Sequence, residues 1–154
     1  MRKNWIFKYF SEDDLKDIQR EVEKVELRTI GEIVLSFRCK RSWLEKLYMP
    51  HELAMKDFDK LKVWNTKQKT GVLVFLIFEE KYYDIIADEG LFAKIHNDTW
   101  DVLEDKLKEE FKAGNYSAGV LHLVNKMGEV LHKDFPTRAG ADNINELPDE
   151  IKIT

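Results

Sequence analysis

The chain has 154 residues, of which 35% are charged, and its formal net charge is −4. This length is typical of one domain, and the acidic balance argues against a nucleic-acid binder, which needs a surplus of Lys and Arg. The strongest apolar run, Val72 to Phe78, is far shorter than the ~20 residues of a membrane helix, and the N-terminus lacks the pattern of a secretory signal. We therefore expect one cytoplasmic domain with no membrane span and no nucleic-acid partner.

The first predicted element is a helix from about Ser11 to Glu26. Ser11 is a suitable N-cap, Asp14 follows it at the spacing of a capping box, and Phe10 before the cap can pack on Leu15. Apolar residues then recur at helical spacing along one face: Leu15, Ile18, Val22 and Val25.

Three strands are predicted, at Gly31–Cys39, Gly71–Phe78 and Tyr82–Ala87. A helix that begins at Pro50 lies between the first two, which makes them parallel neighbours joined by a crossover. The second and third strands are separated only by residues 79–81, which is a hairpin loop, so they run antiparallel.

Two helices complete the pattern. One begins near Asn97 or Asp98 and continues to Phe111, and the other follows Gly114 and ends near Leu131. The order of elements predicts an α/β fold, a three-layer α/β/α sandwich with a small mixed sheet flanked by about four to five helices. We expect the domain to cover residues 10–136 and residues 137–154 to form a polar C-terminal tail.

Polar residues gather at one end of this predicted sheet, where the first two strands begin and the third ends. The candidate metal ligands there are Glu32, Thr66, Asp88 and Glu89, and Glu32 and Asp88 are also the catalytic candidates. Oxygen donors of this kind suit a hard cation, Ca²⁺ or Mg²⁺. Taken alone, the run from Asp88 to Gly90 favours an ordinary turn at a strand end over a binding site.

The next helix begins close to the same end, so its N-terminus is a candidate anion-binding site formed by Asn97, Asp98 and Trp100. Asp98 alone is also an ordinary helix cap. His96 is the histidine nearest this end and a candidate acid–base group.

Two other features favour structural interpretations. Cys39 has no second cysteine to pair with, and a packing role outweighs that of a nucleophile. A basic cluster around Trp43 favours a solvated loop over a site for nucleic acid or an acidic partner: Arg38, Lys40, Arg41 and Lys46.

An ordered series of short motifs over about residues 10–150 resembles the TPM domain family, named for thylakoid-lumen, photosystem II repair and acetylcholine-receptor-regulating members. The matching stretches are Thr29–Val34, Thr70–Phe75, Ile85–Leu91, Trp100-Asp101, Phe111–Gly119, Gly128–Leu131 with Phe135-Pro136, and Asn145–Asp149. Many members carry Gly where this chain has Ala87. The Ala-Asp-Glu-Gly form resembles a bacterial subset, whose members often have a membrane anchor.

The resemblance implies a three-layer α/β/α sandwich, but no single function. Some plant members have been assigned acid phosphatase activity, some members bind calcium or similar ions, and others are interaction or assembly factors. We therefore carry three hypotheses: a divalent-cation-binding interaction or assembly module with a protein partner, a metal-assisted acid phosphatase that acts on a small phosphomonoester, and a set of motifs that only fixes turns. The second lacks an Asp-x-Asp nucleophile, a Cys-x5-Arg loop and a Walker-type loop.

If a cation binds, the sequence places it between Glu32 and Asp88. Acidic residues of the tail compete, but a flexible segment loses conformational entropy when it gathers ligands. The competing residues are Asp142, Glu146, Asp149 and Glu150.

Overall fold

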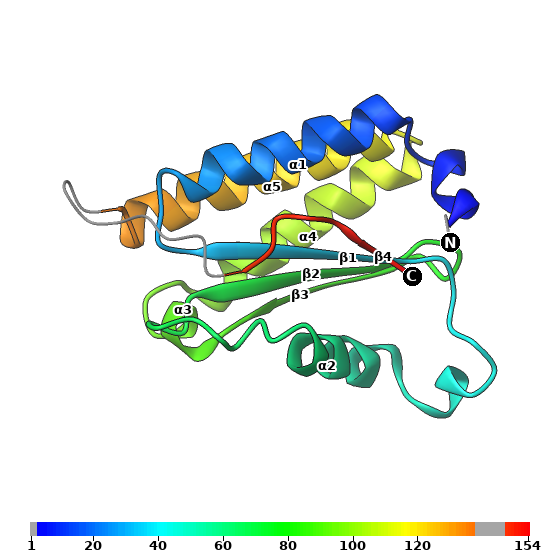
Figure 1. The fold of residues 1–154 in the computed structure, drawn as a ribbon, viewed down its shortest axis with the longest axis horizontal. Helices are drawn as coiled ribbons and strands as arrows, with labels where there is room; N and C mark the ends of the chain where they lie inside the picture. Colours follow the sequence, from blue (N-terminus) through cyan, green and yellow to red (C-terminus); the bar gives the residue numbers. More distant parts are fainter. Residues whose placement is uncertain (1–2, 138–146) are drawn as a thin grey trace.

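The computed structural model describes residues 3–137 and 147–154, which form one mixed sheet with helices on both faces (Figure 1). The sheet order is β3-β2-β1-β4, with β1 at Glu32–Arg38, β2 at Gly71–Ile77, β3 at Tyr82–Ala87 and β4 at Lys152–Ile153. β1 is parallel to β2 and to β4, and β3 is antiparallel to β2. The predicted order and direction of the first three strands are confirmed.

Three helices cover one face of the sheet: α1 (Glu12–Glu26), α4 (Asn97–Lys112) and α5 (Tyr116–Asp134). Helix α2 (Pro50–Lys60) covers the other face, below the sheet in Figure 1. Three short helical elements complete the fold: η1 (Asn4–Lys8) precedes α1, η2 (Glu45–Leu47) lies between β1 and α2, and α3 (Glu89–Phe92) follows β3. This arrangement is the predicted three-layer sandwich.

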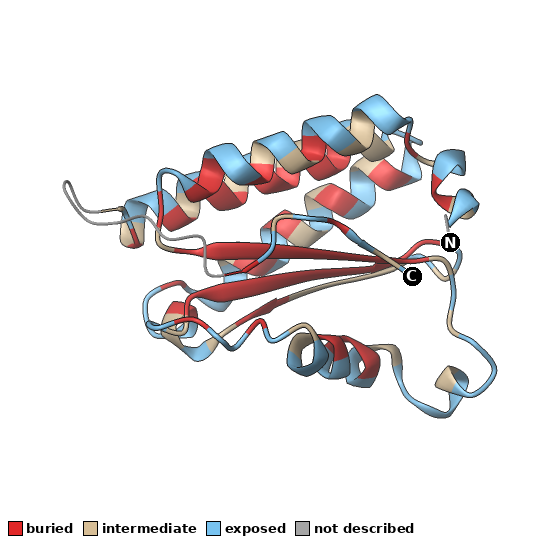
Figure 2. Ribbon diagram, in the orientation of Figure 1, coloured by how far each residue is buried: buried red, intermediate tan, exposed pale blue. Residues whose placement is uncertain are grey.

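Strand β2 is buried along its whole length, as its unbroken apolar run predicts (Figure 2). Val72, Val74 and Leu76 pack with the helices α1, α4 and α5. Leu73 and Phe75 point to the opposite face of the sheet and pack against α2 in a second apolar cluster. The sheet is therefore a rigid platform on which the residues at its ends are held.

Helix α1 begins at the predicted capping box. The amide of Ser11 donates to Asp14 Oδ2 at 2.9 Å, and the amide of Asp14 donates to Ser11 Oγ at 3.0 Å. At the other end of α1, the buried stripe that contains Val22 and Val25 also contains Glu26. A carboxyl group is therefore carried into the interior at the start of the turn that leads to β1.

The last eight residues differ from the prediction of a polar tail. Leu147 and Ile151 are buried, and β4 pairs with β1 at Ser36 and Phe37. A strand of two residues is too short for its alternation to be recognised, and two apolar side chains in a polar stretch give no periodic signal. Asp142 and Glu146, two of the competing acids, lie outside the described residues.

The loop 62–70 lies directly on the sheet end and requires glycine at two positions. A Cβ at Gly71 would stand 2.2 Å from the carbonyl oxygen of Val63, and one at Gly90 would stand 2.2 Å from that of Gln68. Side chains at either position would force the loop away, so both glycines serve close packing of backbone on backbone.

Candidate functional site

A cluster of three carboxylates lies where α1, β1 and the C-terminal segment meet. Glu26 ends α1, Glu32 begins β1, and Asp149 precedes β4. One oxygen atom from each lies within 4.8 Å of the other two. Glu26 is 7% and Glu32 is 3% exposed, so this concentration of acid groups is largely shielded from water. We call Glu26, Glu32 and Asp149 the carboxylate cluster.

Backbone pairing fixes two members of the cluster. The amide of Glu32 donates to the carbonyl of Thr70 on the β2 side, so the amide of Ile33 points to the opposite edge of β1. There it donates to Glu26 Oε2 at 2.8 Å. Because β4 reaches only as far as Ser36, the Glu26 carboxyl satisfies an amide that a longer β4 would have paired.

The environment raises the pKa of Glu26 far above its usual value near 4.5. Burial is the main cause, a hydrogen bond with the Asp149 side chain adds to it, and the charge of Glu32 contributes further. The hydrogen bond from Ile33 acts in the opposite direction but is outweighed. The raised pKa favours the protonated form of Glu26, and this form lessens the repulsion among the three acid groups.

The geometry of the cluster also fits a hard cation. Ca²⁺ takes oxygen ligands at about 2.3–2.6 Å, so two of its ligand oxygens stand at most about 4.6–5.2 Å apart. The three oxygens of the cluster, within 4.8 Å of one another, lie inside this span. Carboxylate oxygens are the donors that such an ion prefers.

The sequence places Glu32 and Asp88 at the same sheet end, and the structure bears this out for their backbones. Glu32 is aligned with Gly71 on β2, and the amide of Asp88 donates to the Gly71 carbonyl from the other side. The two acids are thus separated by two strand spacings, roughly 10 Å. The carbonyl oxygen of Val63 fills the place of the missing Gly71 side chain between them.

The other predicted ligands have local structural contacts. Asp88 is the N-cap of α3, where its Oδ1 accepts from the amide of Glu89 at 2.8 Å, while its Oδ2 is buried with no hydrogen bond among the described residues. Thr66 is buried, and its hydroxyl oxygen accepts from the amide of Thr70 at 2.9 Å. Glu89 is exposed. The structure brings none of these three into the carboxylate cluster.

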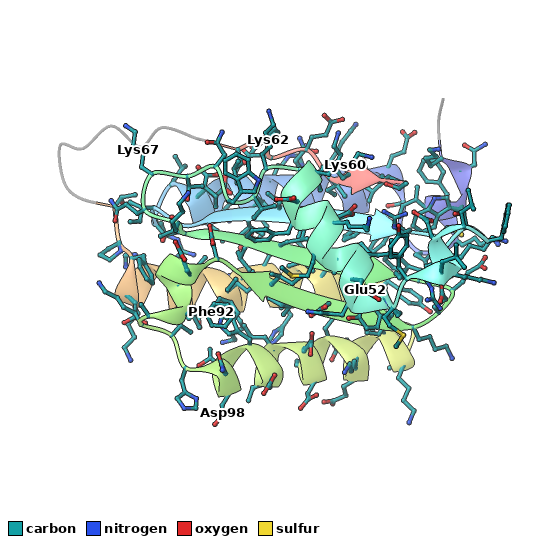
Figure 3. All side chains as sticks on the ribbon, turned by 90° about the horizontal axis from the view of Figure 1, so that it is seen from below. Glu52, Lys60, Lys62, Lys67, Phe92 and Asp98 are labelled. Carbon is teal, nitrogen blue, oxygen red and sulfur yellow. The ribbon has the colours of Figure 1, made fainter. Side chains whose placement is uncertain are left out.

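The predicted anion site lies at the other edge of the sheet from the cluster. Helix α4 packs against β3, and Figure 3 shows Asp98 on that flank of the molecule. The His96 ring caps the helix, with Nδ1 accepting from the amide of Asp98 at 3.2 Å. Asn97 and Asp98 are exposed, whereas Trp100 is buried in the core.

Of the two members that join Glu32 in the cluster, Glu26 is missing from the sequence-based candidates, and Asp149 appears there only as one of the competing acids of the tail. Glu26 had a signal, since it follows Val22 by four residues and so falls on the buried stripe of α1. No signal in the sequence placed Asp149 beside Glu32, because its position depends on how residues 147–154 return to the sheet.

The basic cluster around Trp43 is partly neutralised within the fold. Arg38 is buried and paired with Glu45 and Asp57, and Arg41 is paired with Glu80. Burial, followed by the Glu79 carboxylate, raises the pKa of the Cys39 thiol. A protonated thiol agrees with a packing role for Cys39.

Comparisons with known proteins point to one family. The sequence profile of the TPM domain matches residues 8–130. A solution structure of the BA42 protein from the psychrophilic bacterium Bizionia argentinensis is 31% identical and has a TM-score of 0.84, with 95% of this chain and 96% of that chain covered. No curated protein sequence matches.

A second solved structure supports the fold alone. The N-terminal domain of the cg2496 protein from Corynebacterium glutamicum is 14% identical, with a TM-score of 0.62, over 86% of this chain and 78% of that chain. In the described part of the chain, no helix combines the length and the apolar character needed to cross a bilayer.

Proposed function

Since the chain belongs to the TPM domain family, we propose that it is a divalent-cation-binding interaction or assembly module, with the cation held by the carboxylate cluster. The observation that carries the proposal is the approach of three carboxylate oxygens to within 4.8 Å of one another. This site keeps Glu32 from the predicted ligands, takes Asp149 from the competing acids of the tail, and adds Glu26.

The burial of the cluster supports a cation. Two of its three acids are less than a tenth exposed, and bringing ionised carboxylates together out of water is strongly unfavourable without an opposite charge. A proton on Glu26 offsets part of this repulsion. A divalent cation offsets more of it, so binding of Ca²⁺ or Mg²⁺ displaces the Glu26 proton, and the apparent affinity rises with pH.

The position of the cluster gives the cation a structural consequence. Asp149 belongs to the C-terminal segment, whereas Glu26 and Glu32 flank the turn between α1 and β1. A cation that bridges the three fixes residues 147–154 on the sheet, and with them the edge strand β4. We propose that this ordered edge is where the module meets a protein partner.

Asp88 has less support as a cation ligand than the three members of the carboxylate cluster. Its Oδ2 is buried with no hydrogen bond among the described residues, but Asp88 lies two strands from Glu32 and already caps α3. Thr66 and Glu89 have less support, because the Thr66 hydroxyl is engaged with Thr70 and Glu89 faces solvent.

The phosphatase hypothesis has less support from the geometry. Its phosphate would bind at the start of α4. There Asp98 carries a negative charge, and His96 Nδ1 already accepts a hydrogen bond from one of the amides at the helix N-terminus. Its metal would be held by Glu32 and Asp88, whose backbones lie two strand spacings apart. An assay with p-nitrophenyl phosphate and Mg²⁺ or Ca²⁺ between pH 5 and 7 tests this hypothesis. Turnover that is lost in Asp88→Asn would favour it.

Calorimetric titration of chelator-treated protein with CaCl₂ and MgCl₂ tests the proposed site. We expect one Ca²⁺-binding event that Glu32→Gln weakens at least tenfold and that Glu89→Gln, a control on an exposed acid, leaves unchanged. Equal loss in both variants, or no heat from the wild-type protein at millimolar ion, would refute the cluster as the cation site.

A further inference from the structure

A groove lies beside the outer edge of β4, which pairs with no strand among the described residues. It encloses about 510 Å³ between β4 and the N-terminal part of the chain, η1 and the first turns of α1. Its apolar wall is formed by Ile6, Phe7, Leu15 and Ile153. Phe7 is 39% exposed, and Leu15 and Ile153 are half-buried, so an apolar surface remains open to a ligand. We call this cavity the β4 groove.

The backbone of β4 offers hydrogen bonds to the same groove. The amide and carbonyl of Thr154 are both directed to β1, where they pair with Phe37 and Cys39. Lys152 is aligned with Ser36 of β1. Because successive residues of a strand direct their backbone groups to opposite edges, the N–H and C=O of Ile153 point to the open edge.

The charges around the groove are mainly positive, although the whole chain is acidic. Lys3, Lys16 and Lys152 line it, against Glu12 and Glu150. None of the three lysines has a salt bridge to a described residue. Glu12 lies in the first turn of α1, where the helix dipole stabilises its charge. The lysine ammonium groups therefore remain available to carboxylates of a ligand.

We propose that the β4 groove binds an extended peptide segment of a protein partner, which adds to the sheet as a strand beside β4 and carries alternating apolar and acidic side chains. Main-chain bonds to Ile153 supply pairing, and the apolar wall receives one set of side chains. Lys152, which alternates with Ile153 along β4, lies on the side of the other set, and Lys3 and Lys16 add positive charge beside the groove. A short edge strand with a lysine is also how proteins discourage edge pairing. Here, however, an apolar cavity adjoins the edge, and such a cavity would not help to prevent edge pairing.

The test uses three blocked heptapeptides with the full chain: one that alternates glutamate and valine, one that alternates lysine and valine, and a copy of the first whose valine amides are N-methylated. We expect saturable NMR amide shifts at Ile6, Phe7, Leu15 and residues 151–154 with the glutamate peptide. N-methylation removes the donors that pair with β4, so it should lower the affinity at least tenfold, and the lysine peptide should bind at least tenfold more weakly.

Charge reversal supplies the matched variants. Lys16→Glu with Lys152→Glu should weaken the glutamate peptide roughly tenfold, and Lys108→Glu with Lys112→Glu on α4, an equal change of charge, should leave it unchanged. Dispersed amide spectra establish that both double variants are folded. Absence of saturable shifts at β4, equal affinity of the N-methylated or lysine peptide, or equal loss in the two double variants overturns the proposal.

Discussion

A carboxylate oxygen of Glu32 lies within 4.8 Å of a carboxylate oxygen of Asp149. Glu32 begins the first strand, whereas Asp149 lies just before the last strand. Leu147 is buried under the sheet and Ile151 within the main core, so Asp149 is held between two anchors. A ligand that bridges the pair therefore links the turn after α1 to the C-terminal segment. This link connects the cation site to the edge strand β4.

Asp149→Asn should lower the affinity for Ca²⁺ by at least tenfold, because a neutral amide replaces a charged ligand in a site with three. The neighbouring exposed acid provides the control, and Glu150→Gln should keep the affinity within about twofold. Calorimetric titration at fixed pH measures both. If Asp149→Asn binds Ca²⁺ as well as the wild type does, the C-terminal segment has no part in the site.

The raised pKa of Glu26 predicts a loss of stability as pH increases. Below the unfolded-state pKa, near 4.5, Glu26 is protonated in both states and has no effect. Above it, only the folded state keeps the proton, so the free energy of unfolding falls by up to about 1.4 kcal/mol per pH unit. Glu26→Gln keeps a donor for Asp149 and an acceptor for Ile33 without a titratable group, and should remove this dependence.

Urea unfolding at pH 7.5 and 9.0 in the presence of chelator measures the effect. The wild type should lose about 1–2 kcal/mol over this interval and Glu26→Gln much less. Glu23→Gln, on the exposed side of the same helix, should behave like the wild type. Equal slopes in wild type and Glu26→Gln would mean that Glu26 is ionised in the folded protein.

Gly71→Ala should destabilise the protein by about 3 kcal/mol, because the new Cβ would stand 2.2 Å from a backbone oxygen of Val63. Gly31→Ala is the comparison, since its Cβ would meet the flexible end of Leu131 at 3.0 Å and should cost less than about 1 kcal/mol. Thermal unfolding ranks the two. A Gly71→Ala protein as stable as Gly31→Ala would show that the loop 62–70 moves freely from the sheet end.

Cation and peptide should bind cooperatively, a prediction that depends on both proposals. Because Asp149 lies three residues before Lys152, a cation in the cluster orders the strand to which the peptide adds. Saturating Ca²⁺ should raise the affinity for the glutamate–valine peptide about fivefold or more, and by linkage the peptide should raise the affinity for Ca²⁺ by the same factor. Equal peptide affinity with Ca²⁺ and with chelator would show that the two sites are independent.

Much of the fold followed from local pattern. The capping box at Ser11 and the apolar run of β2 predict elements that the structure confirms, because short-range chemistry determines both. The short connection at residues 79–81 determined the direction of β3 in the same way. Topology then placed the backbones of Glu32 and Asp88 at one sheet end.

The carboxylate cluster could be predicted only in part. Glu32 was a predicted ligand, but its partners come from a buried helix face and from a segment with no periodic pattern. The available signal for Glu26 was its position on the buried stripe of α1, where an acidic residue is unexpected. The position of Asp149 depends on long-range packing of Leu147 and Ile151, which no local pattern encodes.

The most direct test of the account is a Ca²⁺ titration of the chelator-treated protein, followed at every backbone amide by NMR. We predict saturable shifts centred on Glu26, Glu32 and Asp149, accompanied by the release of a proton as Glu26 ionises. Shifts confined to residues 88–90, or no shifts at millimolar Ca²⁺, would contradict the assignment of the carboxylate cluster as the cation site.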